Sequence, residues 1–248
     1  MYKYILFDFD GTVFDTVEGI TKSVQYALAK RGIEAELDSL RCFAGPPLVD
    51  MFMEKFDLSQ EEAEAATEDF RERYQPIGLY ECRVFPGIKE LLHALIGAGL
   101  HVGIATSKPQ HLAEKLLEGE GMLELFEVIS GSDSDGNNNS KAAVLTRAMN
   151  ALGADKKETV LVGDTKYDVA GAKACGVDCI GVRYGYAAEG ELASAGADHI
   201  VNDLQQLKAL LLNEEGESMF KPMRRKTRAI SDEAAKALLL NEKRGILA

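Results

Sequence analysis

The sequence predicts an α/β protein with a Rossmann-like parallel sheet, helices on both faces, and an inserted all-helical domain. Two observations support this prediction. Short apolar runs alternate with segments of helical periodicity over residues 1–12 and 84–213, which is typical of a parallel sheet covered by helices. Residues 16–80, in contrast, show helical periodicity without such strands.

Six apolar runs are expected to form the strands. The first contains Ile5, Leu6 and Phe7, and its shortness and apolar character are typical of a buried strand. The expected strands cover roughly residues 3–8, 101–106, 127–130, 159–163, 178–182 and 199–201. Helices are expected at roughly 87–98, 109–119, 141–152, 166–175 and 203–212, with Pro109 in a first helical turn.

The inserted segment is expected to contain three helices. Apolar residues recur at helical spacing within residues 17–31, and 49–56 and 60–74 also fit helices. Ser59, with acidic residues shortly after it, suits a helix start. We therefore divide the chain into a core of residues 1–15 and 81–213, a helical domain of 16–80, and a basic tail of 214–248.

Composition places the chain among globular proteins and disfavours several partners. It has 248 residues, 46% hydrophobic and 27% charged, and no run approaches the roughly 18–20 apolar residues that span a bilayer. No leader pattern is visible at the start, so we expect a cytoplasmic protein without membrane contact. The four cysteines lack CxxC spacing and are expected to be reduced thiols. A net charge of −12 disfavours nucleic acid.

Two carboxylates follow the first expected strand. Asp8 and Asp10 are two residues apart, so their side chains would point the same way, and Gly11 permits a tight turn after them. One carboxylate could attack a substrate, the other could carry a proton, and both could face a cation. The alternative is an acidic turn without chemistry.

Further polar residues stand at the ends of later runs. Thr106 ends one apolar run, Asp164 and Asp168 follow another, and Lys141 opens an expected helix. In a parallel sheet the carboxyl ends of the strands share one edge, so these residues could meet in one crevice. A lysine at a helix amino terminus is electrostatically unfavourable, which favours a function over a surface position for Lys141.

These residues together resemble the four motifs of the haloacid dehalogenase superfamily. The motifs are Asp8-x-Asp10-Gly11-Thr12, then Thr106, Lys141, and Gly163-Asp164 with Asp168, and the resemblance covers residues 1–213. Dehalogenases of the superfamily lack the second aspartate. Asp10 therefore implies the phosphatase and phosphomutase branches, and residues 16–80 resemble the helical cap that closes over the active site. The alternative is a helical domain with only a packing role.

The resemblance implies an Mg²⁺-dependent phosphomonoester hydrolase that forms an aspartyl phosphate. Asp8 would be the nucleophile, and Asp10 would protonate the leaving oxygen and then activate water. Lys141 would neutralise the phosphoryl group, and Thr106 would donate its hydroxyl to it. The expected Mg²⁺ ligands are Asp8, the Asp10 main-chain carbonyl, Asp164 and Asp168. Asp168 could ligate through water or only orient its neighbours, and a solvated helix residue is the alternative for it.

Substrate contacts are expected from two regions. Gly11, Thr12 and Ser107 could bind the phosphoryl group with amides and hydroxyls, and Arg41 and Gly45 could reach the substrate from the cap. A purely structural Gly-Pro-Pro turn after Ala44 is the alternative for the cap segment. The expected partner is a small phosphorylated metabolite, with phosphoglycolate or a nucleoside monophosphate foremost, and sugar phosphates and pyrophosphate open. A phosphomutase and a catalytically idle binding module remain alternatives for the function. The oligomeric state is expected to be a monomer or a homodimer.

The basic tail has a second, separate resemblance. Residues 221–248 hold eight Lys or Arg and three Asp or Glu, a net charge of +5. The stretch 220–248 resembles the opening of flavin-binding split-barrel proteins related to pyridoxamine phosphate oxidase, which implies a truncated fusion with a flavin oxidoreductase. The alternative is a basic tail with one amphipathic helix over 232–241, used in packing or oligomerisation.

Overall fold

A six-stranded sheet forms the centre of the computed structural model, which describes residues 1–133 and 140–213. Its order is β5-β4-β1-β6-β7-β8, and every neighbouring pair is parallel. The predicted parallel α/β core is confirmed. The strands are β1 (Tyr4–Phe7), β4 (His101–Pro109), β5 (Val128–Ser132), β6 (Thr159–Gly163), β7 (Asp178–Val182) and β8 (His199–Val201).

The two faces of the sheet carry separate hydrophobic cores, because side chains alternate along each strand. In β1, Ile5 and Phe7 pack into one core, whereas Leu6 packs into the other. Helices α4 (Ile88–Gly97), α5 (Gln110–Gly119) and α9 (Leu204–Leu212) contribute to the first core. Helices α6 (Lys141–Leu152), α7 (Lys166–Cys175) and α8 (Glu191–Ala195) contribute to the second.

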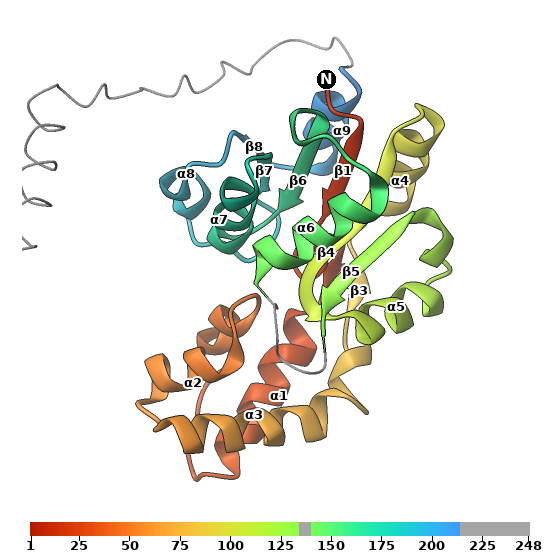
Figure 1. The fold of residues 1–248 in the computed structure, drawn as a ribbon. Coiled ribbons are helices and arrows are strands. Elements are labelled where there is room, and N and C mark those ends of the chain that lie inside the picture. Colours follow the sequence, from red (N-terminus) through yellow and green to blue (C-terminus); the bar gives the residue numbers. More distant parts are fainter. Residues whose placement is uncertain (134–139, 214–248) are drawn as a thin grey trace, which may run out of the picture.

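A helical insertion separates β1 from the rest of the sheet in sequence. It consists of α1 (Val17–Ala29), η1 (Leu37–Phe43), α2 (Leu48–Phe56), α3 (Gln60–Tyr74) and η2 (Gly78–Tyr80). A two-stranded antiparallel ribbon of β2 (Phe14–Asp15) and β3 (Arg83–Val84) joins it to the core. Figure 1 shows the insertion at the bottom, beyond the carboxyl ends of β1 and β4. The remaining short helices are η3 (Leu123–Leu125) and η4 (Lys156–Glu158).

Several local predictions can be compared with the structure. The helix start at Ser59 is confirmed, because Ser59 and Glu62 form a reciprocal capping box at α3. The position of Pro109 was wrong: β4 continues to Pro109, whose extended backbone (ψ 128°) makes it the N-cap of α5 rather than a first-turn residue. No helix of the described residues is long and apolar enough to cross a membrane. The expectations for the tail 214–248 fall outside the described residues.

Candidate active site

Asp8 and Lys141 form the centre of the site. Asp8 directly follows β1, and its backbone N–H donates to the Val162 carbonyl of β6 at 2.8 Å. Lys141 is the first residue of α6, whose start is fixed by the Ser140 side chain accepting from the Ala143 N–H. Lys141 Nζ lies 2.6 Å from Asp8 Oδ1, and the Lys141 residue is only 8% exposed. It is therefore a buried ion-pair partner and not a surface lysine.

The same ammonium reaches a second carboxylate. Lys141 Nζ lies 2.9 Å from Asp168 Oδ1 and donates to the Ala105 carbonyl at 3.3 Å. Asp168 belongs to the first turn of α7, where its Oδ2 accepts from the Thr165 N–H at 3.0 Å and the Thr165 hydroxyl at 2.9 Å. Asp168 is fully buried, so it is not a solvated helix residue.

Asp164 is held by two donors from distant segments. It follows β6 and is fully buried. Its Oδ1 accepts from the Thr12 hydroxyl at 3.2 Å, and its Oδ2 accepts from the Tyr186 N–H at 2.8 Å. The Thr12 hydroxyl thus orients this carboxylate, and its expected contact with substrate stays a prediction. Tyr186 did not figure among the residues predicted from sequence.

The electrostatics of the cluster are dominated by burial. The pKa of Asp8 is raised to about 7, chiefly by burial and also by the Asp168 charge, and the Lys141 ammonium opposes both effects. Burial also raises the pKa of Asp164 well above its ordinary value, with Asp168 and Asp8 adding to the effect. Burial alone would lower the pKa of Lys141, but Asp168 and Asp8 reverse the shift and hold it protonated. An added cation would therefore relieve repulsion among these carboxylates.

The carboxylates of Asp8, Asp164 and Asp168 fit a hard divalent cation. Each offers an oxygen atom, and these atoms lie within 4.8 Å of one another. Apart from the ion pairs with Lys141, Asp8 Oδ1 and Asp168 Oδ1 receive no hydrogen bond from the described residues. Carboxylate oxygens are the ligands that Mg²⁺ prefers. The side chain of Asp10 lies outside this cluster and accepts a hydrogen bond from Lys108.

Asp10 forms an ion pair with Lys108, a residue for which no role was predicted from the sequence. Lys108 Nζ lies 3.0 Å from Asp10 Oδ1 and donates to the Tyr74 hydroxyl at 2.6 Å. Lys108 lies two residues after Thr106 on β4, and both are buried whereas Ser107 between them is exposed. Strand alternation was the available signal, because it directs Lys108 to the side that Thr106 faces.

Thr106 remains available for an anion. Its Oγ1 accepts from the Lys108 N–H at 3.1 Å, which leaves the hydroxyl hydrogen free to donate. Ser107 is exposed near the carboxyl end of β4, between the buried Thr106 and Lys108, and its role in substrate binding stays a prediction.

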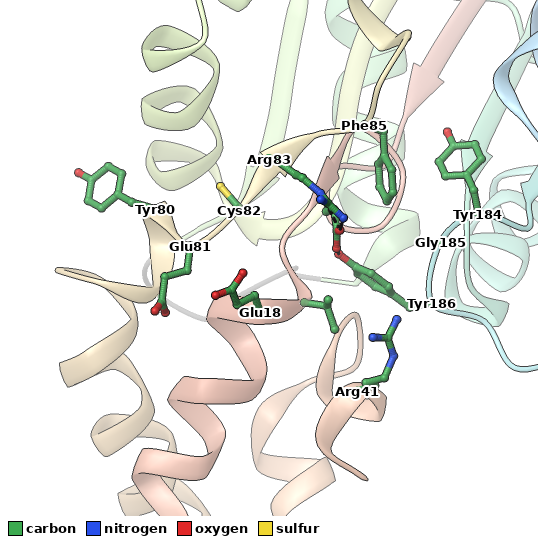
Figure 2. Close-up of a pocket in the computed structure, with 12 residues that line it drawn as sticks. Glu18, Arg41, Tyr80, Glu81, Cys82, Arg83, Phe85, Tyr184, Gly185 and Tyr186 are labelled. Carbon is green, nitrogen blue, oxygen red and sulfur yellow. Dashed lines mark hydrogen bonds and ion pairs between the residues drawn. The ribbon is translucent and has the colours of Figure 1, made fainter. Parts of the chain in front are cut away.

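The helical insertion contributes a cavity and a loop beside the core. Gly45 has φ +110°, and a Cβ on it would lie 3.5 Å from Thr165 Cγ2, so the loop approaches the start of α7. A cavity of about 540 Å³ lies between the insertion and the core, and Figure 2 shows Arg41 directed toward Tyr186 within it. The lining residues are Asp15, Val17, Glu18, Arg41, Tyr80, Glu81, Cys82, Arg83, Phe85, Tyr184, Gly185 and Tyr186.

Glycines allow the site to close around its carboxylates. A Cβ on Gly11, which has φ +81°, would overlap Asp164, and a Cβ on Gly185 would overlap the same side chain. A Cβ on Gly163 would overlap Asp168. Each of these positions requires glycine, because the backbone there lies close to a carboxylate. Individual sequence motifs do not reveal this close approach.

Gly171 provides a test of how tightly Lys141 is packed. A Cβ on Gly171 would overlap Cγ of Lys141, close to the backbone where the side chain cannot swing away. We expect Gly171→Ala to lower the free energy of unfolding by about 1–3 kcal/mol through overpacking. Gly97→Ala is the control, because no atom of the described residues outside its chain neighbours and its own helix backbone lies within 4 Å of its Cβ position. Urea unfolding measures both, and equal stabilities of the two variants would contradict the expected packing.

Comparison with known proteins places this site in context. The profile of the family described as haloacid dehalogenase-like hydrolase matches residues 5–182. A 5′-nucleotidase of Pseudomonas aeruginosa is 41% identical over 211 residues, covering 85% of this chain and 96% of that protein. A phosphoglycolate phosphatase of Cupriavidus necator is 35% identical, covering 84% and 92%. The crystal structure of a predicted phosphatase from Clostridium acetobutylicum superposes with a TM-score of 0.82 at 40% identity, covering 86% and 99%.

Proposed function

The chain is a phosphatase of the haloacid dehalogenase-like hydrolase family, and from that premise we propose that it hydrolyses small phosphomonoesters with Mg²⁺ through an aspartyl phosphate. The observation that carries the proposal is the buried cluster of Asp8, Asp164 and Asp168 around Lys141. Its carboxylates supply a nucleophile and cation ligands, and Lys141 supplies a fixed positive charge.

Asp8 and Asp10 divide the proposed reaction between them. A carboxylate oxygen of Asp8 attacks phosphorus, and the bond from phosphorus to the leaving oxygen breaks while Asp10 gives that oxygen its proton. Asp10 then accepts a proton from water, whose oxygen attacks phosphorus and releases inorganic phosphate and the free Asp8 carboxylate. Lys141 and the Thr106 hydroxyl stabilise negative charge on the phosphoryl oxygens throughout.

Bound Mg²⁺ would add charge neutralisation at the phosphoryl oxygens, held by the carboxylates of Asp8 and Asp164 with the Asp10 carbonyl. Asp168 already uses one oxygen in the capping box of α7 and the other on Lys141, so we assign it to orienting the site and ligating through water. Thr12 and the Tyr186 N–H hold Asp164 in place for the cation.

We assign the helical insertion as a cap that selects the substrate. Arg41 faces the cavity between the insertion and the core, and Gly45 brings the cap loop against Thr165 beside Asp168. These positions suit contact with the part of the substrate that carries no reacting phosphate. Two relatives are named for a nucleotide and for phosphoglycolate, so we propose these two substrate classes first.

Phosphate release tests this function directly. We expect Mg²⁺-dependent release from phosphoglycolate or from nucleoside 5′-monophosphates, and loss of release after chelation with EDTA, because the carboxylate cluster requires a cation. Sugar phosphates and pyrophosphate complete the panel. A folded protein that releases no phosphate from any compound, but isomerises a sugar phosphate, would contradict hydrolysis and indicate a phosphomutase.

A further inference from the structure

The ammonium of Lys108 joins Asp10 to the helical insertion. It binds both Asp10 oxygens, at 3.0 and 3.4 Å, and the Tyr74 hydroxyl at 2.6 Å. We propose that Lys108 and Tyr74 are positioning residues, which make the orientation of the Asp10 carboxylate depend on the seating of the cap against the core. This inference rests on the proposed role of Asp10 and adds the residues that control it.

Burial restricts where the Lys108 ammonium can lie. Its side chain is only 3% exposed, and that of Asp10 is 15% exposed. A buried ammonium requires charged or hydrogen-bonded partners, because its desolvation is costly. The described structure provides Asp10 and Tyr74 as its hydrogen-bonding partners, with the rings of Phe9 and Tyr74 at 5.5 and 5.1 Å. Loss of either polar partner therefore changes the position of the ammonium.

Side-chain contacts hold the end of α3, which carries Tyr74, to neighbouring segments. Tyr74 is the last residue of α3, and its ring stacks on Phe70 at 4.9 Å. The preceding Arg73 binds Glu81 at 2.8 Å and donates to Ser23 of α1 at 3.1 Å. These contacts tie α3 to α1 and to the segment leading into β3. The position of the Tyr74 hydroxyl therefore depends on the position of the cap, and this hydroxyl binds Lys108 of core strand β4.

Asp10 needs such support because it lies in a tight turn rather than in a strand. It forms only an isolated bridge with Phe14, beyond the end of β1. Lys108 gives its carboxylate two hydrogen bonds from a fixed strand, and Tyr74 keeps the ammonium on the Asp10 side. A misplacement of about 1 Å in a catalytic group can cost on the order of 100-fold in rate. A substitution of Tyr74 is therefore expected to change the orientation of Asp10 and, through it, the rate.

Tyr74→Phe removes the hydroxyl and keeps the ring that packs on Phe70 and Lys108. We expect kcat to fall about 10-fold with little change in KM. The substitution is repeated in an Asp10→Asn background, with 4-nitrophenyl phosphate, whose leaving group departs without protonation. If Tyr74 acts through Asp10, adding Tyr74→Phe to Asp10→Asn changes kcat by less than about twofold, because the effects of coupled residues are not additive.

Tyr26→Phe is the matched control. Its hydroxyl also lies on the insertion and donates to Glu72 at 2.9 Å, but on an exposed surface. We expect it to leave kcat unchanged. Thermal melting confirms that each variant is folded.

Two kinetic results would overturn the proposal: an unchanged kcat in Tyr74→Phe, or an equal further loss of kcat when Tyr74→Phe is added to Asp10→Asn. A crystal structure of Tyr74→Phe provides a readout independent of turnover. We expect Asp10 to leave the Lys108 ammonium, and an unaltered Asp10–Lys108 pair would refute the positioning role even in an inactive protein. If the wild type is inactive but Asp10 is displaced in the Tyr74→Phe structure, the result counts against the proposed function and not against the positioning role.

Discussion

Replacing Asp8 with asparagine is expected to lower turnover by about 10⁴-fold or more, as expected when a covalent nucleophile is removed. The amide has nearly the shape of the carboxylate but cannot attack phosphorus. The fold should persist, because burial and the Asp168 charge already disfavour the ionised form of Asp8 and raise its pKa to about 7. Steady-state phosphate release and thermal melting measure the two effects separately.

Asp57→Asn is the control for this substitution. Asp57 is exposed and adopts a left-handed conformation, with φ 54°, that asparagine also tolerates. We expect it to leave turnover unchanged. Mass spectrometry of Asp8→Asn must exclude deamidation back to aspartate. Residual turnover above a few per cent in an intact variant would remove Asp8 as the nucleophile.

Replacing Lys141 with methionine is expected to lower the free energy of unfolding by about 3–5 kcal/mol without Mg²⁺, because it leaves buried carboxylates without their cation. Among the described residues, Lys141 is the only side-chain cation that pairs with Asp8 and Asp168. Mg²⁺ should restore part of the loss by compensating the same charges. Turnover should fall by about 100- to 1,000-fold even with Mg²⁺, since a fixed charge at the phosphoryl group is gone.

Lys89→Met provides the comparison for Lys141. Lys89 pairs with Glu120 at 3.0 Å, but both side chains are more than two-fifths exposed. Such surface pairs contribute about 0–1 kcal/mol. Urea unfolding of the two variants, with and without Mg²⁺, gives the contrast. A loss in Lys141→Met no larger than that in Lys89→Met would mean that the carboxylates do not depend on Lys141.

The sheet and the positions of its polar ends could be predicted because they follow from local patterns. The run from Ile5 to Phe7 alternates between two cores in the structure, and Asp8 follows directly at its carboxyl end. The start of α6 places Lys141 beside Asp8, as the shared edge of a parallel sheet implies. The extension of β4 to Pro109 was missed because an X-Pro pair fits both a strand end and a helix start.

Contacts between segments far apart in sequence were decided only by the tertiary structure. Thr12 and Asp164 are separated by 152 residues, and Asp10 and Lys108 by 98. Periodicity and motif spacing determine which residues reach the carboxyl edge of the sheet, because both depend on neighbours along the chain. They do not determine which donor meets which carboxylate, or that Tyr74 shares the Lys108 ammonium, because those contacts depend on how the insertion packs against the core.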